Sequence, residues 1–99
     1  MIESKNENGI LTIILPPRID ASNASAVEQE IEGINDPTSD QIVVFDADQL
    51  EYISSAGLRI IIKVVKREKS VSVVNVSQTV YDIFEVSGFT NFISIEKKA

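Results

Sequence analysis

Two kinds of hydrophobic pattern alternate along this chain. Continuous apolar runs predict strands, and apolar residues that recur every three or four positions predict helices with one buried face. The expected strands are residues 2–7, 10–15, 42–45, 71–76 and 92–95, and the expected helices are residues 22–34, 58–68 and 78–87. Alternating strands and helices predict an α/β domain with a mixed, mostly parallel sheet. We therefore expect one domain, residues 1–99, with four to five strands and three or four helices.

Turn and capping residues mark the ends of several of these elements. Asn8 and Gly9 form a strong hairpin signal, because both central positions of a type I′ turn need positive φ. Ser77 is expected to cap the third helix with its hydroxyl, and Gly88 is expected to end it. Residues 35–37, Asn-Asp-Pro, are expected to end the first helix.

The apolar positions also predict the core. Residues 42–45 are expected to form the central strand, with Val43 and either Phe45 or Val44 nearly fully buried. The near-continuous apolar run at residues 10–15 suggests a strand that is buried on both faces. Each helix is expected to bury one stripe: Ala24, Val27, Ile31 and Ile34 in the first, Leu58, Ile61, Ile62 and Val65 in the second, and Val80, Ile83 and Phe84 in the third.

The composition narrows the classes of function. The net charge is −6, which argues against nucleic acid as a main partner, because phosphate binding needs a concentrated basic face. The chain has no cysteine and no histidine, which removes disulfides, thiolate sites, histidine acid–base catalysis and most zinc sites. Residues 1–5 show no signal-peptide pattern, and no apolar run approaches the roughly 20 residues that span a bilayer. We expect a cytoplasmic protein, a monomer when free, without cofactor, metal or membrane attachment.

Two adjacent serines stand at the start of the second helix, where residues 52–59 read Tyr-Ile-Ser-Ser-Ala-Gly-Leu-Arg. A serine hydroxyl at this position can accept a hydrogen bond from a free helix N–H, so each serine has a simple structural explanation as a cap. The same N–H groups and the helix dipole favour negative charge. A phosphate on either serine would therefore be tolerated.

The serine motif resembles the signature of the STAS domain, the anti-sigma factor antagonist family of bacteria. Residues 15–21, 74–77 and 86–89 are similar to other parts of the family pattern, so the resemblance covers essentially the whole chain. It implies a STAS-like fold and a non-enzymatic switch that binds an anti-sigma factor, itself a serine kinase, and so frees a sigma factor. Phosphorylation of Ser55 by that kinase would inactivate the switch, and a metal-dependent serine phosphatase would reset it. Ser54, which stands where some members carry aspartate, is the alternative acceptor.

A partner-docking surface is expected around the acceptor, formed by Asp20, Ser54, Ala56, Gly57 and Arg59. Ala56 leaves the hydroxyl unobstructed. Gly57 costs about 1 kcal/mol against alanine inside a helix, which suggests that a bulky partner comes close. Asp20 either caps the first helix or takes part in docking. Arg59 begins a basic stripe along the helix to Arg67, which is either a solvated face or part of the docking surface.

Other classes of function fit these residues less well. Asp46 follows a buried strand, as the phosphorylated aspartate of a receiver domain does, but the chain offers only Asp20 where that site needs an acidic pair. A serine hydrolase needs a base held by a third group, and Lys63 lies two turns from Ser55. The topology of the predicted sheet alone is expected to bring Asp20, Asp46, Asp48 and Ser55 to its carboxyl edge. One alternative stays open: a STAS module without phosphorylation that acts as a small-ligand-binding or scaffold protein.

Overall fold

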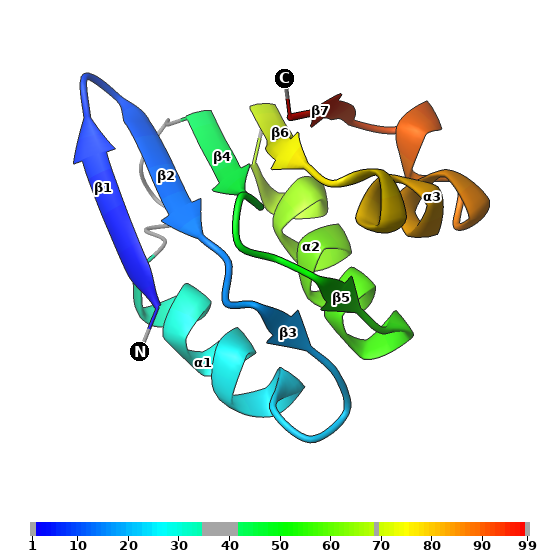
Figure 1. Cartoon of the computed structure of the whole chain (residues 1–99). Helices are drawn as coiled ribbons and strands as arrows, with labels where there is room; N and C mark the ends of the chain where they lie inside the picture. The colour runs from blue at the N-terminus through cyan, green and yellow to red at the C-terminus, as the bar shows by residue number, and fades with distance from the viewer. Residues whose placement is uncertain (1, 35–41, 69, 99) are drawn as a thin grey trace.

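The computed structural model describes residues 2–34, 42–68 and 70–98 (Figure 1). The strands are β1 (Glu3–Glu7), β2 (Ile10–Ile14), β3 (Arg18–Ile19), β4 (Ile42–Asp46), β5 (Tyr52–Ile53), β6 (Ser70–Val76) and β7 (Ser94–Lys97). The helices are α1 (Ala24–Ile34), α2 (Ser55–Arg67) and α3 (Gln78–Val86), followed by a short 3-10 helix, η1 (Phe89–Asn91). The expected end of the first helix, residues 35–37, lies outside the described residues.

Five strands form one sheet in the order β1-β2-β4-β6-β7. β1 runs antiparallel to β2, and the other neighbouring pairs are parallel. β4 therefore lies at the centre, and its side chains Val43 and Phe45 are fully buried. The α/β fold with a mixed, mostly parallel sheet is as the pattern predicts, and the prediction of a central strand at residues 42–45 is confirmed.

The predicted turn and cap residues behave as expected. Asn8 and Gly9 join β1 to β2 with φ angles of 52° and 79°. The Ser77 hydroxyl accepts a hydrogen bond from the backbone N–H of Val80 at 3.3 Å at the start of α3. Gly88 follows α3 with a φ of 81°, a conformation that glycine adopts without steric cost.

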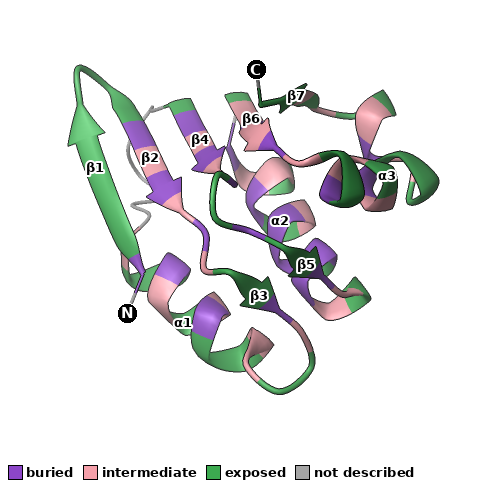
Figure 2. Ribbon diagram, viewed as in Figure 1, coloured by how far each residue is buried: buried purple, intermediate pink, exposed green. Residues whose placement is uncertain are grey.

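α1 and α2 lie on the same side of the sheet, and this arrangement decides which strand residues are buried (Figures 1 and 2). Along β2, Leu11 and Ile13 are buried, whereas Thr12 and Ile14 are half-buried and Ile10 is 39 % exposed. The prediction that residues 10–15 are buried on both faces is therefore wrong. The strand alternates because helices cover one of its faces, and the apolar residues of the other face keep partial access to water.

The predicted helix stripes form most of the helical part of the core. The buried members are Val27, Ile31, Leu58, Ile61, Val80 and Phe84. In α2, however, Ile62 and Val65 are only half-buried, and Ile60 and Val64 are buried as well. The buried face of α2 is turned relative to the prediction because this helix contacts α1 and β5 in addition to β6.

The last strand begins two residues later than predicted. The chain turns through η1 after Gly88, and Phe89 enters the core, with its ring centroid 5.6 Å from that of Phe84. Phe92, which the pattern placed in a strand, is instead 71 % exposed. β7 then pairs with β6 at the edge of the sheet.

Candidate functional site

Two short strands, β3 and β5, position the serine motif. They pair in parallel as a second small sheet, with Arg18 opposite Tyr52 and Ile19 opposite Ile53. In Figure 1 this pair lies beyond the carboxyl ends of β2 and β4. The N–H of Ser54 continues the pairing by donating to the carbonyl of Ile19 at 2.8 Å. The pattern predicted loops here, because a strand of two residues is too short to show alternation.

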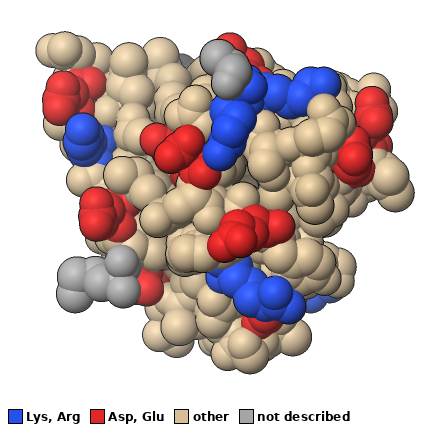
Figure 3. Space-filling view, viewed as in Figure 1, with Lys and Arg blue, Asp and Glu red and all other residues tan. Residues whose placement is uncertain are grey.

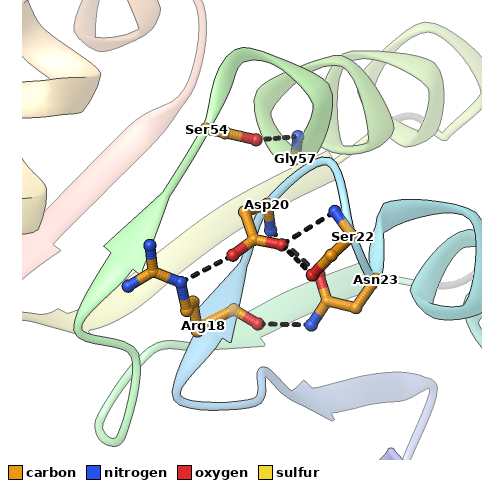
Figure 4. A network of polar contacts seen from close by, with 6 residues as sticks. All are labelled: Arg18, Asp20, Ser22, Asn23, Ser54 and Gly57. Atoms are coloured by element: carbon orange, nitrogen blue, oxygen red, sulfur yellow. Dashed lines mark hydrogen bonds and ion pairs between the residues drawn. The ribbon is translucent and has the colours of Figure 1, made fainter.

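The two serines have different roles in the structure. Ser54 is the N-cap of α2: it is half-buried, and its hydroxyl accepts a long hydrogen bond of 3.4 Å from the N–H of Gly57 (Figure 4). Ser55 is the first residue of α2, and its side chain is exposed. Within the described part of the chain, the Ser55 hydroxyl makes no hydrogen bond. The structure therefore leaves Ser55 accessible in the first turn and uses Ser54 to cap the helix.

Asp20 organises the turn between β3 and α1, beside the serine motif (Figure 4). Its carboxylate accepts hydrogen bonds from the hydroxyl and N–H of Ser22, at 2.5 and 2.9 Å, and from the Nε of Arg18 at 2.6 Å. The Ser22 hydroxyl, followed by Arg18, lowers the pKa of Asp20 from 3.8 to about 2. The start of α1 is held by the Asp20 carbonyl, which accepts from the N–H groups of Asn23 and Ala24. Asp20 thus caps α1 through its backbone, and its carboxylate shapes the turn.

We expect the contribution of the Asp20 turn to the stability of the folded state to depend on pH. Since folding lowers the pKa of Asp20, its carboxylate stabilises the folded state above the unfolded-state pKa of 3.8, and this contribution is lost as the pH falls through about 2. The difference in free energy of unfolding between wild type and Asp20→Asn should shrink from about pH 4 to about pH 2. Urea titrations across this range measure it. A difference that stays constant would contradict the assignment of the lowered pKa to Asp20.

A groove of about 300 Å³ runs between α1 and α2 next to the serine motif. Its lining residues come from both helices and from the turn before α1: Ala21, Ala24, Ser25, Glu28, Ala56, Arg59, Ile60 and Lys63. Two predicted docking residues, Ala56 and Arg59, are among them. Sequence reasoning missed the contribution of α1, because its residues carry no recognisable motif. The small residues just before and at the start of α1, such as Ala21 and Ser25, are the sequence feature that could have indicated an accessible surface.

The basic stripe on α2 is only partly free. The Lys63 ammonium pairs with Glu28 at 2.5 Å, and one nitrogen of Arg67 lies 2.7 and 2.8 Å from the two carboxylate oxygens of Glu32. These pairs join α2 to α1, although exposed ion pairs contribute only about 0–1 kcal/mol each. Arg59 is exposed and has no acidic partner among the residues that the structure describes. Of these three cations, Arg59 is the one available to another molecule.

Gly57 does not take part in the surface. It is buried, and a Cβ atom at this position would lie 2.6 Å from Cγ1 of Ile53 and 2.8 Å from Cγ2 of Ile19. The expectation that Gly57 lets a bulky partner approach is corrected: the missing side chain lets α2 pack closely on β3 and β5. Gly57 therefore holds the first turn of α2 close to the small sheet.

The acidic residues do not gather at one place. Asp46 ends β4, where its carboxylate accepts from the Asn75 side-chain amide at 3.1 Å and from the N–H of Asp48 at 3.0 Å. Asp20 and Ser55 follow β3 and β5, which extend past the end of the main sheet. The expected single cluster is thus divided into two, because the small sheet of β3 and β5 carries Asp20 and Ser55 away from Asp46. The pattern did not predict this second sheet. In the described ranges, no group of three or more Asp, Glu, Cys or His residues could hold a metal ion.

The surface around these elements is mixed in charge. On the face seen in Figure 3, acidic and basic side chains alternate, and most of the surface between them is uncharged. No helix in the described part of the chain is long and apolar enough to cross a membrane.

The chain thus combines a sheet of this order with an exposed serine in the first turn of α2 and the Asp20 turn beside it. These features can be compared with those of known proteins. The STAS domain family model matches residues 1–99, and the chain belongs to this family. A candidate anti-sigma factor antagonist of Bordetella bronchiseptica, BtrV, is 32% identical over 92 residues, which cover 89% of this chain and 78% of BtrV.

Three solved structures show the same fold. An anti-sigma factor antagonist from Mycobacterium paratuberculosis superposes with a TM-score of 0.84 at 19% identity, covering 97% of this chain and 84% of the other. The anti-sigma factor antagonist SpoIIAA in its unphosphorylated form has a TM-score of 0.77 at 14% identity, covering 96% and 87%. The phosphorylated form of the Bacillus SpoIIAA has a TM-score of 0.69 at 13% identity, covering 96% and 90%.

Proposed function

We propose that this protein is an anti-sigma factor antagonist that works as a phosphorylation-controlled switch. In its unphosphorylated form it binds an anti-sigma factor that is also a serine kinase, and a sigma factor is freed. The observation that carries this proposal is the exposed hydroxyl of Ser55 at the N-terminus of α2, next to the groove between α1 and α2. This hydroxyl makes no hydrogen bond with the residues that the structure describes. The names of the related proteins and the phosphorylated form of one of them support it.

The docking surface in this proposal consists of Ser55, the groove residues Ala56 and Arg59, and the turn that Asp20 holds. Ala56 adds only a methyl group beside the hydroxyl, so a partner could pack against the first turn of α2. The Asp20 carboxylate, which is paired with Arg18, and the exposed Arg59 guanidinium supply charges of opposite sign to this surface. Charges placed in this way favour one orientation of a partner over others.

Phosphorylation would transfer the γ-phosphoryl group of ATP to the Ser55 hydroxyl oxygen and release ADP and the hydroxyl proton. The product carries a charge of about −1.5 to −2, which the free N–H groups and the dipole of the helix N-terminus tolerate in the isolated protein. Arg59 lies four residues further along α2, on the same side of the helix, and can pair with the phosphate. In the complex the phosphate would be buried without its water and Arg59 would be withdrawn from the partner, so the complex would dissociate.

The fold does not need to change in this mechanism. Ser54, not Ser55, caps α2, so a modified Ser55 disturbs no hydrogen bond of the described residues. The protein itself performs no catalysis. A metal-dependent serine phosphatase would remove the phosphate and restore the binding form, and the exchange of partners would take place in the cytoplasm.

The acceptor is tested by phosphorylation with the serine kinase encoded nearest to this protein in its genome. With ATP, the wild-type protein and Ser54→Ala should each gain the mass of one phosphoryl group, whereas Ser55→Ala should gain none. Ser54→Ala is the matched control, because it removes a neighbouring hydroxyl and leaves Ser55 in place. Labelling of Ser55→Ala would contradict the assignment to Ser55, and labelling that is lost only in Ser54→Ala would move the acceptor to Ser54.

A further inference from the structure

Glu68 is a largely buried residue whose carboxylate faces a groove and has no partner among the described residues. It follows the last residue of α2, and only 9 % of its surface is exposed. Its backbone N–H donates to the carbonyl of Val64 at 2.9 Å, but the carboxylate makes no hydrogen bond or ion pair within the described ranges. Ser55 lies at the other end of the same helix, about 20 Å away by the rise of 13 residues. The proposed switch therefore makes no use of Glu68.

The position of this carboxylate is unfavourable in two respects. The C-terminus of a helix carries partial negative charge, so an anionic side chain there is repelled by the last carbonyl groups. Since only 9 % of the residue is exposed, the carboxylate has also lost part of its water, and a poorly hydrated charge without a partner destabilises the folded state. A cation placed beside Glu68 would relieve both effects.

A groove with two chemically different ends lies at this place. One end, a cavity of about 220 Å³, is polar, and its lining residues include Glu68, Ser70 and Ser94. The adjoining cavity, of about 290 Å³, is almost entirely apolar. Val65 and Phe92 line both cavities, so the two form one continuous groove between α2, η1 and β7.

The apolar end is built from side chains that the fold leaves partly uncovered. Ile62 and Ile93 are half-buried there, and Phe92 is 71 % exposed. Lys66 lines this cavity and does not line the polar one. The groove thus combines an acidic residue in its polar part with apolar side chains and one basic residue in its apolar part.

We propose that this groove binds a small aliphatic amine. The ammonium group pairs with the Glu68 carboxylate and donates to the hydroxyls of Ser70 and Ser94, which accept hydrogen bonds. The alkyl chain lies along the apolar end, where it removes the exposed Phe92 ring from water. Lys66 repels an ammonium group and therefore sets the direction of the ligand. This site is separate from the Ser55 surface, so a ligand could be bound while a partner is docked.

The test is a titration with n-octylamine, followed by NMR on the isotope-labelled protein. We expect saturable shifts of the Val65 and Ile93 methyl signals, and much weaker shifts with octanoate, which has the same chain length but the opposite charge. Ethylamine should also bind weakly, because it lacks the apolar chain. Glu68→Gln should bind octylamine about 10- to 100-fold more weakly, as the loss of one charged hydrogen bond predicts. Glu85→Gln, an exposed change on α3, should bind like wild type.

The stability of Glu68→Gln and the binding of octylamine to Phe92→Ala provide two further tests. Glu68→Gln should melt at the same temperature as the free wild type or higher, because it removes an unpaired buried charge. Phe92→Ala changes an exposed side chain, so it should fold and should bind octylamine more weakly. Equal binding of octanoate and octylamine, unchanged affinity in Glu68→Gln, or no saturable shift with octylamine would each overturn the proposal.

Discussion

Ser55→Asp is expected to bind the anti-sigma partner about 100-fold or more weakly than wild type, whereas Ser55→Ala should bind as tightly as wild type. The aspartate places a negative charge in the docking surface and, like the phosphate, draws Arg59 away from the partner. Burying this charge without its water costs several kcal/mol, which corresponds to at least this factor. Alanine removes a hydroxyl that makes no hydrogen bond in the described structure and adds no charge. Binding titrations of both variants against the purified kinase partner measure the difference.

Thermal melts of the same variants separate binding from folding. Ser55→Asp should be at least as stable as Ser55→Ala, because a negative charge suits the N-terminus of α2. Ser54→Ala is the control for capping and should lose about 0.5–1 kcal/mol, since Ser54 holds the N–H of Gly57 only through a long hydrogen bond. Of the two Ser55 variants, Ser55→Asp is thus expected to be at least as stable as Ser55→Ala but to bind the partner more weakly. Equal binding by the two Ser55 variants would mean that charge at this residue does not control the interface.

Gly57→Ala is expected to destabilise the protein by about 1–3 kcal/mol, although alanine is the better helix former. The added methyl group would lie 2.6 Å from Ile53 and 2.8 Å from Ile19, so α2 must move away from the small sheet or both side chains must shift. The same movement would displace Ser55 relative to the Asp20 turn. Weaker partner binding should therefore accompany the loss of stability, and urea titrations combined with binding titrations measure both effects.

Gly33→Ala is the matched control in α1. A Cβ atom at Gly33 would have no neighbour within 4 Å, and the backbone there is helical. Alanine should consequently stabilise the protein by up to about 1 kcal/mol through helix propensity alone. The two glycines thus predict changes of opposite sign. A neutral or stabilising Gly57→Ala would show that the contact with Ile53 and Ile19 relaxes without cost.

Local chemistry was sufficient to predict the parts of the fold in which one residue determines the backbone. Asn8 and Gly9 require positive φ angles in a two-residue hairpin, and Ser77 and Gly88 delimit a helix, so these positions could be read without tertiary information. The central strand could also be predicted, because residues 42–45 are apolar throughout. The exposed position of Ser55 followed from the same reasoning about the N-terminus of a helix.

Tertiary packing determined what the pattern could not predict. An apolar run does not reveal whether one or both faces of a strand are covered, and residues 10–15 were therefore misjudged. The pairing of β3 with β5 depends on contacts between segments more than 30 residues apart, and two residues carry no periodicity. The role of Gly57 was misjudged for the same reason, since only the structure shows Ile19 and Ile53 beneath it.

In the proposed mechanism, a phosphate on Ser55 controls binding while the fold stays the same. The most direct measurement is the affinity of the kinase partner for the wild-type protein before and after stoichiometric phosphorylation, with NMR spectra of both forms. We expect binding to fall by about 100-fold or more on phosphorylation, with spectral changes confined to the first turn of α2, Arg59 and the Asp20 turn. Equal affinity of the two forms, or a loss of affinity that comes with a general rearrangement of the sheet, would contradict this account.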